Sequence, residues 1–204
     1  MTTLFDDTQL FNSGELRIRE FDIPDAELTL WEHHFSRTEA DGYYWILLEE
    51  TPWKQEEITL FDKTHLTPRM TVWYGKQRNS SKEDRPFTPT LQNIRDKVEA
   101  TTGVKYTSVL VNLYRDGNDG VGWHRDHDRE QGPMPIVASV SFGETRPFEI
   151  RHKFRKELEK IRIPLNHGSL LLMAGPMQHY WEHQVPKTAR IIKPRINLTF
   201  RIVH

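Results

Sequence analysis

The chain has 204 residues, which suits one domain with a sizeable hydrophobic core. Cysteine is absent, so disulfides and thiolate metal sites are excluded, and any metal must be held by carboxylates or by some of the ten histidines. The formal net charge is −1 with histidine neutral, so any affinity for nucleic acid must come from a local basic patch.

Residues 1–20 are expected to be a loose lead-in to the domain. They lack the basic segment followed by an apolar segment that marks a secretory signal. No apolar run in the chain is long enough to span a membrane. Together with the absence of cysteine, this favours a cytoplasmic protein, or a nuclear one in a eukaryote, with no membrane partner. We also expect a monomer.

The first predicted helix lies in residues 22–35, "DIPDAELTLWEHHF". Pro24 stands where a first helical position would be, and its fixed backbone angle suits that position. Leu28, Trp31 and Phe35 follow at helical spacing and would form the apolar face.

A second helix is predicted in residues 88–103, "TPTLQNIRDKVEATTG". Pro89 lies near its start, and Gly103 is a typical residue to end it. Its apolar stripe would consist of Leu91, Ile94 and Val98. This helix and the first one would both lie in the N-terminal half of the chain.

Short strands are predicted elsewhere, because runs rich in Val, Ile and Leu are separated by Gly, Pro, Asn and Asp. In the first half they are "YYWILLEE" (43–50) and "RMTVWYG" (69–75). After Gly103 they are 106–115, 135–143, 146–151, 160–165, 168–175 and 194–203. Strands at that spacing indicate a sandwich or barrel. We therefore predict a mainly β fold, a barrel or jelly roll with N-terminal helices, as a single domain over residues 1–204.

Polar side chains recur with a period of two in three segments, two of them predicted strands. In "RINLTFR" (195–201) the polar set is Arg195, Asn197, Thr199 and Arg201. In "VLVNLYR" it is Asn112 and Tyr114, and in "WHRDHD" it is His124, Asp126 and Asp128 if that segment is extended. One interpretation is the solvent face of an antiparallel sheet. The other is a polar interior, where buried arginines need an anion and suit a small dicarboxylate.

Such a polar interior can bind a metal ion. His124 and Asp126 present an imidazole and a carboxylate from one side of an extended segment. Two imidazoles and one carboxylate on one triangular face are the ligand set of non-heme Fe(II) oxygenases. The chemistry of the residues leaves four candidates for the second imidazole: His127, His167, His179 and His183.

Taken together, these segments closely resemble the AlkB family of Fe(II)- and 2-oxoglutarate-dependent dealkylases. The resemblance is carried by "NLYRDGNDGVGWHRDHD", "PIVASVSFGETRPFEIR", "GSLLLMAGPMQHYWEHQVPK" and "PRINLTFR", and it runs from about Pro68 to the C-terminus. It implies a double-stranded β-helix, or jelly roll, with the catalytic core in residues 104–204 and the nucleotide-recognition side in residues 68–103.

The resemblance also implies a role for individual residues. It makes His124, Asp126 and His183 the Fe(II) ligands and catalytic centre, with O2 as a further co-substrate. It assigns 2-oxoglutarate binding to Asn112, Tyr114, Arg195, Asn197 and Arg201. It assigns substrate contacts to Trp73 and Tyr74 in "PRMTVWYGK", and to Asp128, which matches an acidic residue that the family uses near the target base.

The function implied by the resemblance is oxidative demethylation of 1-methyladenine and 3-methylcytosine in DNA or RNA, as repair of alkylation damage. Residues 51–63, "TPWKQEEITLFDK", lack an obvious long apolar hairpin for opening a duplex, which favours single strands. The chain departs from the family after Gly75: "KQRNSSKEDRPF" is polar where relatives have an aromatic-rich stretch. Three alternatives are a modifying enzyme of RNA or tRNA, a protein-directed or lipid-directed hydroxylase, and a metal-binding module without catalysis that binds nucleic acid.

Charge is uneven along the chain. Residues 151–162, "RHKFRKELEKIR", contain six lysines and arginines and two glutamates. One interpretation is a solvated hairpin or helix face, and the other is a surface that contacts the phosphates of the substrate.

Overall fold

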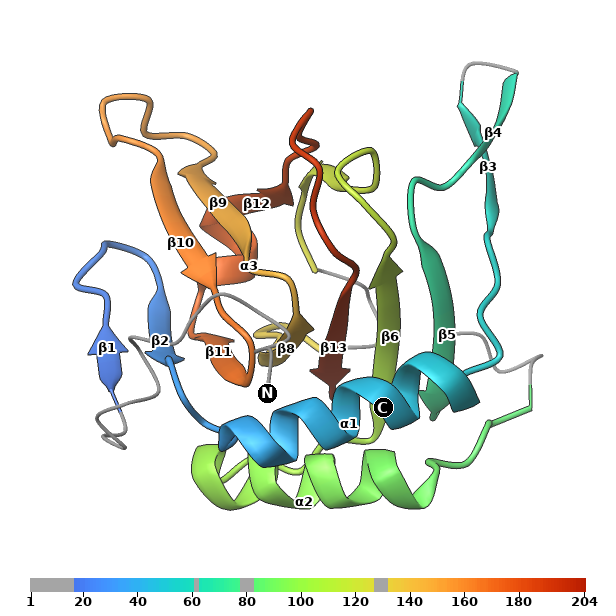
Figure 1. Ribbon diagram of the computed structural model, residues 1–204. Coiled ribbons are helices and arrows are strands. Elements are labelled where there is room, and N and C mark those ends of the chain that lie inside the picture. The colour runs from blue at the N-terminus through green and yellow to red at the C-terminus, as the bar shows by residue number, and fades with distance from the viewer. Residues whose placement is uncertain (1–16, 61–62, 78–82, 127–131) are drawn as a thin grey trace.

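The computed structural model describes residues 17–60, 63–77, 83–126 and 132–204. Two antiparallel β-sheets form the body of the fold, and two helices lie together along one side of it (Figure 1). This arrangement confirms the predicted mainly β jelly roll with helices from the N-terminal half.

The larger sheet has seven strands in the order β1-β2-β11-β8-β13-β6-β5. Their bounds are β1 Ile18–Glu20, β2 Glu27–Trp31, β5 Met70–Gly75, β6 Ser108–Tyr114, β8 Val137–Gly143, β11 Ser169–Ala174 and β13 Arg195–Arg201. The smaller sheet has four strands in the order β10-β9-β12-β7. Their bounds are β7 Val121–His124, β9 Arg146–His152, β10 Ile161–Leu165 and β12 Trp181–Val185. The predicted strands at 69–75 and after Gly103 are thus confirmed.

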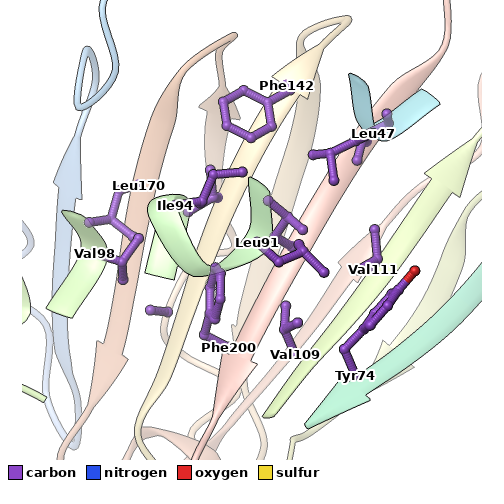
Figure 2. Close-up of a cluster of buried hydrophobic side chains, with 14 of the residues drawn as sticks. Leu47, Tyr74, Leu91, Ile94, Val98, Val109, Val111, Phe142, Leu170 and Phe200 are labelled. Atoms are coloured by element: carbon purple, nitrogen blue, oxygen red, sulfur yellow. The ribbon is translucent and has the colours of Figure 1, made fainter. Parts of the chain in front are cut away.

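Helix α2 (Pro89–Thr102) confirms the prediction for residues 88–103. The side chain of Thr88 caps it by accepting the Leu91 N–H at 3.2 Å, and Gly103 ends it in the left-handed conformation (φ 71°). The expected stripe faces the larger sheet (Figure 2). It forms one core cluster with apolar residues of the strands, among them Val109, Val111, Phe142, Leu170 and Phe200.

The predicted strand at 43–50 is wrong, because these residues belong to helix α1 (Arg37–Glu50). Ser36 and Glu39 cap its start reciprocally: the Ser36 N–H donates to Glu39 at 2.8 Å, and the Glu39 N–H donates to Ser36 Oγ. Its buried residues Ala40, Tyr44 and Leu47 recur at helical spacing. The unbroken apolar run in "YYWILLEE" hid that spacing, since a run of this length does not distinguish a buried strand from a helix.

The predicted helix at 22–35 is also wrong, because residues 27–31 form strand β2. Leu28 and Leu30 are both buried, so the buried residues recur every two positions, as in a strand, and not every 3.6 positions, as in a helix. β2 pairs with β11, with Leu28 opposite Met173. Pairing with a strand more than a hundred residues away overrides the local helical pattern. β1, at the end of the expected lead-in, then pairs with β2.

A hairpin lies in the region where no long apolar hairpin was expected. It consists of β3 (Glu57–Leu60) and β4 (Lys63–Leu66), four residues each, and stands out from the body of the fold (Figure 1). The turn between them, 61–62, is outside the described residues. Across the described ranges, no helix combines the length and the apolar composition that crossing a membrane requires.

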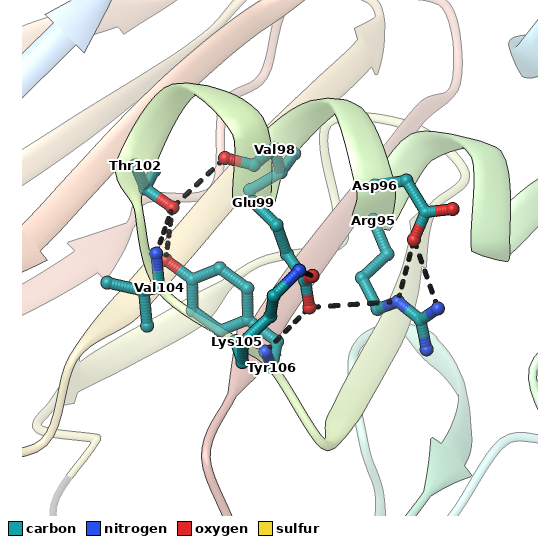
Figure 3. Close-up of polar contacts among 8 residues, drawn as sticks. All are labelled: Arg95, Asp96, Val98, Glu99, Thr102, Val104, Lys105 and Tyr106. Carbon is teal, nitrogen blue, oxygen red and sulfur yellow. Dashed lines mark hydrogen bonds and ion pairs between the residues drawn. The ribbon is translucent and has the colours of Figure 1, made fainter.

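Glu99 joins the end of α2 to the strand that follows. Its side chain is only 8% exposed, accepts the Tyr106 backbone N–H at 2.9 Å, and meets Lys105 and Arg95 (Figure 3). We expect Glu99→Ala to lower the free energy of unfolding by about 1–3 kcal/mol, because a buried N–H loses its acceptor. Denaturant unfolding measures this value.

Asp96 provides the matched control for Glu99 on the same helix. Its carboxylate pairs with Arg95 at 3.0 Å but is 65% exposed. Asp96→Ala should therefore change the free energy of unfolding by no more than about 0.5 kcal/mol. Equal losses in the two variants would contradict the role given to Glu99.

Candidate metal and dicarboxylate site

A cavity of about 390 Å³ lies between the two sheets. Its walls come from β5, β6, β8, β11 and β13 of the larger sheet and from β7, β9 and β12 of the smaller one. This volume lies within the range of small-molecule sites. The cavity receives the polar side chains that alternate along these strands, so their positions decide what it can bind.

Strand β13 shows why the alternation leads inward. All seven of its residues are buried. Ile196, Leu198 and Phe200 join the core under the helices, whereas Arg195, Asn197, Thr199 and Arg201 line the cavity. The interpretation of "RINLTFR" as having a solvent face is therefore excluded. The neighbouring strand β6 also directs its polar residues into the cavity: Asn112 lies opposite Asn197, and Tyr114 lies opposite Arg195.

Three candidate metal ligands meet at one place in this cavity. His124 ends β7 and is paired in register with His183 of β12, while Asp126 follows two residues after His124. One ligand atom from each of the three lies within 4.8 Å of the other two. His124 Nδ1 is 2.8 Å from the Gly122 carbonyl oxygen, which leaves its Nε2 for a metal.

The electrostatics of this cluster suit a cation. Burial acts to raise the pKa of the Asp126 carboxyl, but the adjacent Arg201 guanidinium and His183 hold that pKa well below its ordinary value. Burial, together with the neighbouring His183, lowers the pKa of His124. An ionised carboxylate and a neutral imidazole are the forms that bind metal ions.

Arg195 marks the other end of the cavity. It is 1% exposed; its Nη2 donates to Ser141 Oγ at 2.9 Å, and its guanidinium carbon lies 5.3 Å from the centre of the Tyr114 ring. Its Nε and Nη1 are buried without a hydrogen-bond partner, and none of the described carboxylates pairs with it. Burial lowers the pKa of Arg195 to about 10. A buried guanidinium of this kind needs an anion beside it. Arg195 is therefore a candidate to bind a carboxylate group of a ligand.

Arg201 lies at the metal end of the cavity, beside Asp126. Its Nη2 pairs with Asp126, while its Nε and Nη1 are buried and have no partner. The unpartnered donors of both arginines and the His–Asp–His cluster therefore fit a metal ion together with an anionic chelator. The amides of Asn112 and Asn197 donate to backbone carbonyls at 3.3 and 2.9 Å, so they shape the wall between these groups.

The remaining predicted residues fall in three places. Trp73 lines the cavity, with its ring 5.6 Å from the Arg201 guanidinium carbon. Tyr74 was predicted to contact substrate, but the structure corrects this: it is 4% exposed and packs in the core under α2 (Figure 2). Neighbouring residues of a strand point to opposite faces, so only one of the two aromatics can reach the cavity. Asp128 lies outside the described residues.

The other histidines considered as ligands lie elsewhere. His179 Nε2 is 2.5 Å from the Pro133 carbonyl oxygen. His167 Nδ1 accepts the Gly143 N–H at 2.8 Å, on the side of the larger sheet that faces α1. His127 is outside the described residues. Neither His167 nor His179 belongs to the cluster of ligand atoms.

Several cavity residues were missed in the sequence. Ser139 lines the cavity, and Ser141 contacts the cavity residue Arg195; both alternate with apolar residues in "VASVSFG", and this period of two was a usable signal. Phe148 stacks on His183 with ring centroids 5.0 Å apart, and nothing in its local sequence indicated this. Others line the cavity from loops or strand ends: Glu56, Arg69, Gln77 and Arg125.

Comparison with known proteins decides the family. Residues 27–201 match the model of the 2OG-Fe(II) oxygenase superfamily. Alpha-ketoglutarate-dependent dioxygenase alkB homolog 3 of Bos taurus is 41% identical over 178 residues, covering 81% of this chain and 62% of that protein. DNA oxidative demethylase ALKBH2 of Mus musculus is 38% identical over 182 residues, covering 82% and 76%. The chain belongs to the AlkB family.

Membership in the AlkB family confirms the resemblance drawn from the sequence, and the superfamily's description names both Fe(II) and 2-oxoglutarate. The solved structure of OsALKBH1 is 17% identical with a TM-score of 0.60 and covers 91% of this chain and 100% of that one, which supports the fold alone. This AlkB-family chain spans 62% of the length of the bovine relative.

Proposed function

We propose that this chain is an Fe(II)- and 2-oxoglutarate-dependent dioxygenase that demethylates N-alkylated bases in DNA or RNA and so repairs alkylation damage. The substrates are 1-methyladenine and 3-methylcytosine. One observation carries the proposal: a His–Asp–His cluster and two arginines with unpartnered donors share one cavity. The names of the relatives, a dioxygenase and a DNA oxidative demethylase, support the class of reaction.

In this proposal His124, Asp126 and His183 hold Fe(II), and Arg195 pairs with the distal carboxylate of 2-oxoglutarate. Asn112, Tyr114, Asn197 and Arg201 complete the 2-oxoglutarate site. Fe(II) and 2-oxoglutarate together supply the activation of O2 that hydroxylates an N-methyl group, with succinate and CO2 as co-products. The hydroxymethyl group then leaves as formaldehyde and restores the unmodified base.

Trp73 and Asp128 are the proposed substrate contacts. Trp73 is the aromatic residue on the cavity side of β5, where an extracted base needs a flat apolar surface. A methylated adenine or cytosine carries a positive charge, which a carboxylate such as that of Asp128 would attract. A methyl group on the pairing edge also weakens pairing, so less energy is needed to bring the base out of the stack.

We propose a preference for single strands, because the strands of the β3–β4 hairpin have only four residues each. The test uses one oligonucleotide sequence with a single 1-methyladenine, prepared as single-stranded DNA, duplex DNA and RNA. Mass spectrometry reports the loss of one methyl mass after aerobic incubation with Fe(II), ascorbate and 2-oxoglutarate. Faster repair of the duplex would contradict the strand preference; succinate without methyl loss on all three would contradict the substrate class.

The basic segment 151–162 is proposed to contact phosphates. It comprises the end of β9, an exposed loop and the first two residues of β10, and Arg155 in the loop also pairs with Glu157 at 2.9 Å. Neutralising Lys153, Arg155 and Lys156 together should reduce the slope of log K against log salt by about 2, at ~0.7 per lost contact. Binding of a single-stranded oligonucleotide at several salt concentrations measures the slope. Lys105→Gln is the control: the Lys105 side chain is 88% exposed beside α2, away from this segment, and its neutralisation should leave the slope unchanged.

A further inference from the structure

Gln178 is a buried polar residue next to the candidate metal ligands. It lies on the short helix α3 (Met177–Tyr180) and is 0% exposed. Its Oε1 accepts the backbone N–H of Asp126 at 2.9 Å, and its Nε2 is 3.8 Å from the sulfur of Met173. Burying an amide without hydrogen-bond partners costs about 2–7 kcal/mol. These two contacts therefore also fix the orientation of the Gln178 side chain.

Asp126 needs such a contact because it lies beyond the end of its strand. β7 ends at His124, so the sheet ladder does not hold the backbone two residues later. Arg201 holds the carboxylate of Asp126, and Gln178 holds its backbone. A further contact joins the same two segments, since Arg125 Nη1 donates to the His179 carbonyl oxygen at 3.4 Å.

The helix that carries Gln178 also leads directly into β12. His183 lies in that strand, five residues after Gln178. A hydrogen bond from Asp126 to Gln178 therefore ties one ligand-bearing segment to the other. The register between β7 and β12 fixes His124 against His183, but it does not extend to Asp126.

We infer that Gln178 is a positioning residue for the metal site: by accepting the Asp126 N–H, it sets the place of the Asp126 carboxylate relative to His183. This inference rests on the proposed ligand set. Groups just outside a metal's ligands hold those ligands in place, and their loss typically reduces metal affinity roughly 10- to 100-fold. We assign an effect of that size to Gln178, acting through the backbone of Asp126.

The test measures Co(II) binding to the metal-free protein by its visible absorption. Gln178→Met removes the acceptor with little change in length, and it should raise the Co(II) dissociation constant about 10- to 100-fold. Gln178→Glu keeps an oxygen for the Asp126 N–H and should restore most of the affinity. Gln184→Met is the matched control, since the Gln184 amide donates to Glu149 at 2.8 Å on the same strand as His183 and does not line the cavity.

Thermal unfolding of the metal-free variants separates positioning from general stability. A merely structural role would lower the unfolding temperature of Gln178→Met and leave its Co(II) dissociation constant unchanged, and this result would overturn the inference. If Gln178→Met does not fold, Gln178→Asn is used instead. Asn is one methylene shorter, so its oxygen no longer reaches the Asp126 N–H, and this variant must show the loss of Co(II) affinity. His183→Ala tests the ligand set itself: wild-type Co(II) affinity in that variant would refute the proposed metal site rather than the role of Gln178.

Discussion

His183→Ala is expected to abolish demethylation and 2-oxoglutarate consumption together. The variant removes one of three proposed ligands from a cluster whose candidate ligand atoms lie within 4.8 Å of one another. Two remaining ligands would leave the metal weakly held, so the loss of affinity should exceed the roughly 10- to 100-fold that loss of an outer contact costs. Titration with Fe(II) under anaerobic conditions, followed by a turnover assay at saturating Fe(II), measures both effects.

His179→Ala is the matched control for His183→Ala. Both histidines lie in "MQHYWEHQVP", but the ring of His179 is directed to the Pro133 carbonyl oxygen and does not belong to the cluster. We expect this variant to retain Fe(II) binding and turnover. If instead His179→Ala lost Fe(II) and His183→Ala retained it, the ligand assignment would be wrong.

Arg195→Met is expected to raise the KM for 2-oxoglutarate more than any other single change at the far end of the cavity. The guanidinium is 1% exposed, and two of its nitrogens have no partner among the described residues. Removing one member of a buried charge pair costs about 2–5 kcal/mol, or roughly 30-fold to several thousand-fold in affinity. The measurement is the 2-oxoglutarate dependence of succinate formation.

Two further variants sharpen the test at Arg195. Arg195→Lys keeps the positive charge but loses the planar pair of donors, so its KM should fall between those of the wild type and Arg195→Met. Arg162→Met, whose side chain is 68% exposed on β10, should leave the KM unchanged. A KM for Arg195→Met equal to that of the wild type would show that the 2-oxoglutarate carboxylate binds elsewhere.

Sequence periodicity predicted the elements in which the two faces of a segment differ strongly. Strand β13 alternates arginine, asparagine and threonine with large apolar residues, and α2 has both a clear apolar stripe and end signals at Pro89 and Gly103. The same reasoning failed at β2 and α1. Leu28, Trp31 and Phe35 fit a helix by spacing, but pairing with β11 decided the outcome.

The candidate site was predictable as a list of residues but only partly as an arrangement. His124 and Asp126 are close in sequence, whereas the selection of His183 over His179 came from the family resemblance and not from the chemistry of either residue. Tyr74 shows the limit at a single position, because adjacent aromatics in a strand cannot share a face. Gln178 could not be found from the sequence, since its role depends on a contact with a backbone 52 residues away.

The most direct test of the account compares succinate with methyl loss in one reaction. Purified protein is incubated with Fe(II), ascorbate, 2-oxoglutarate, O2 and a single-stranded oligonucleotide that carries one 1-methyladenine. We predict about one succinate for each methyl group lost, in the stoichiometry of a 2-oxoglutarate-coupled hydroxylation, and neither product with His183→Ala. Methyl loss that persists in His183→Ala or does not require 2-oxoglutarate would contradict the account.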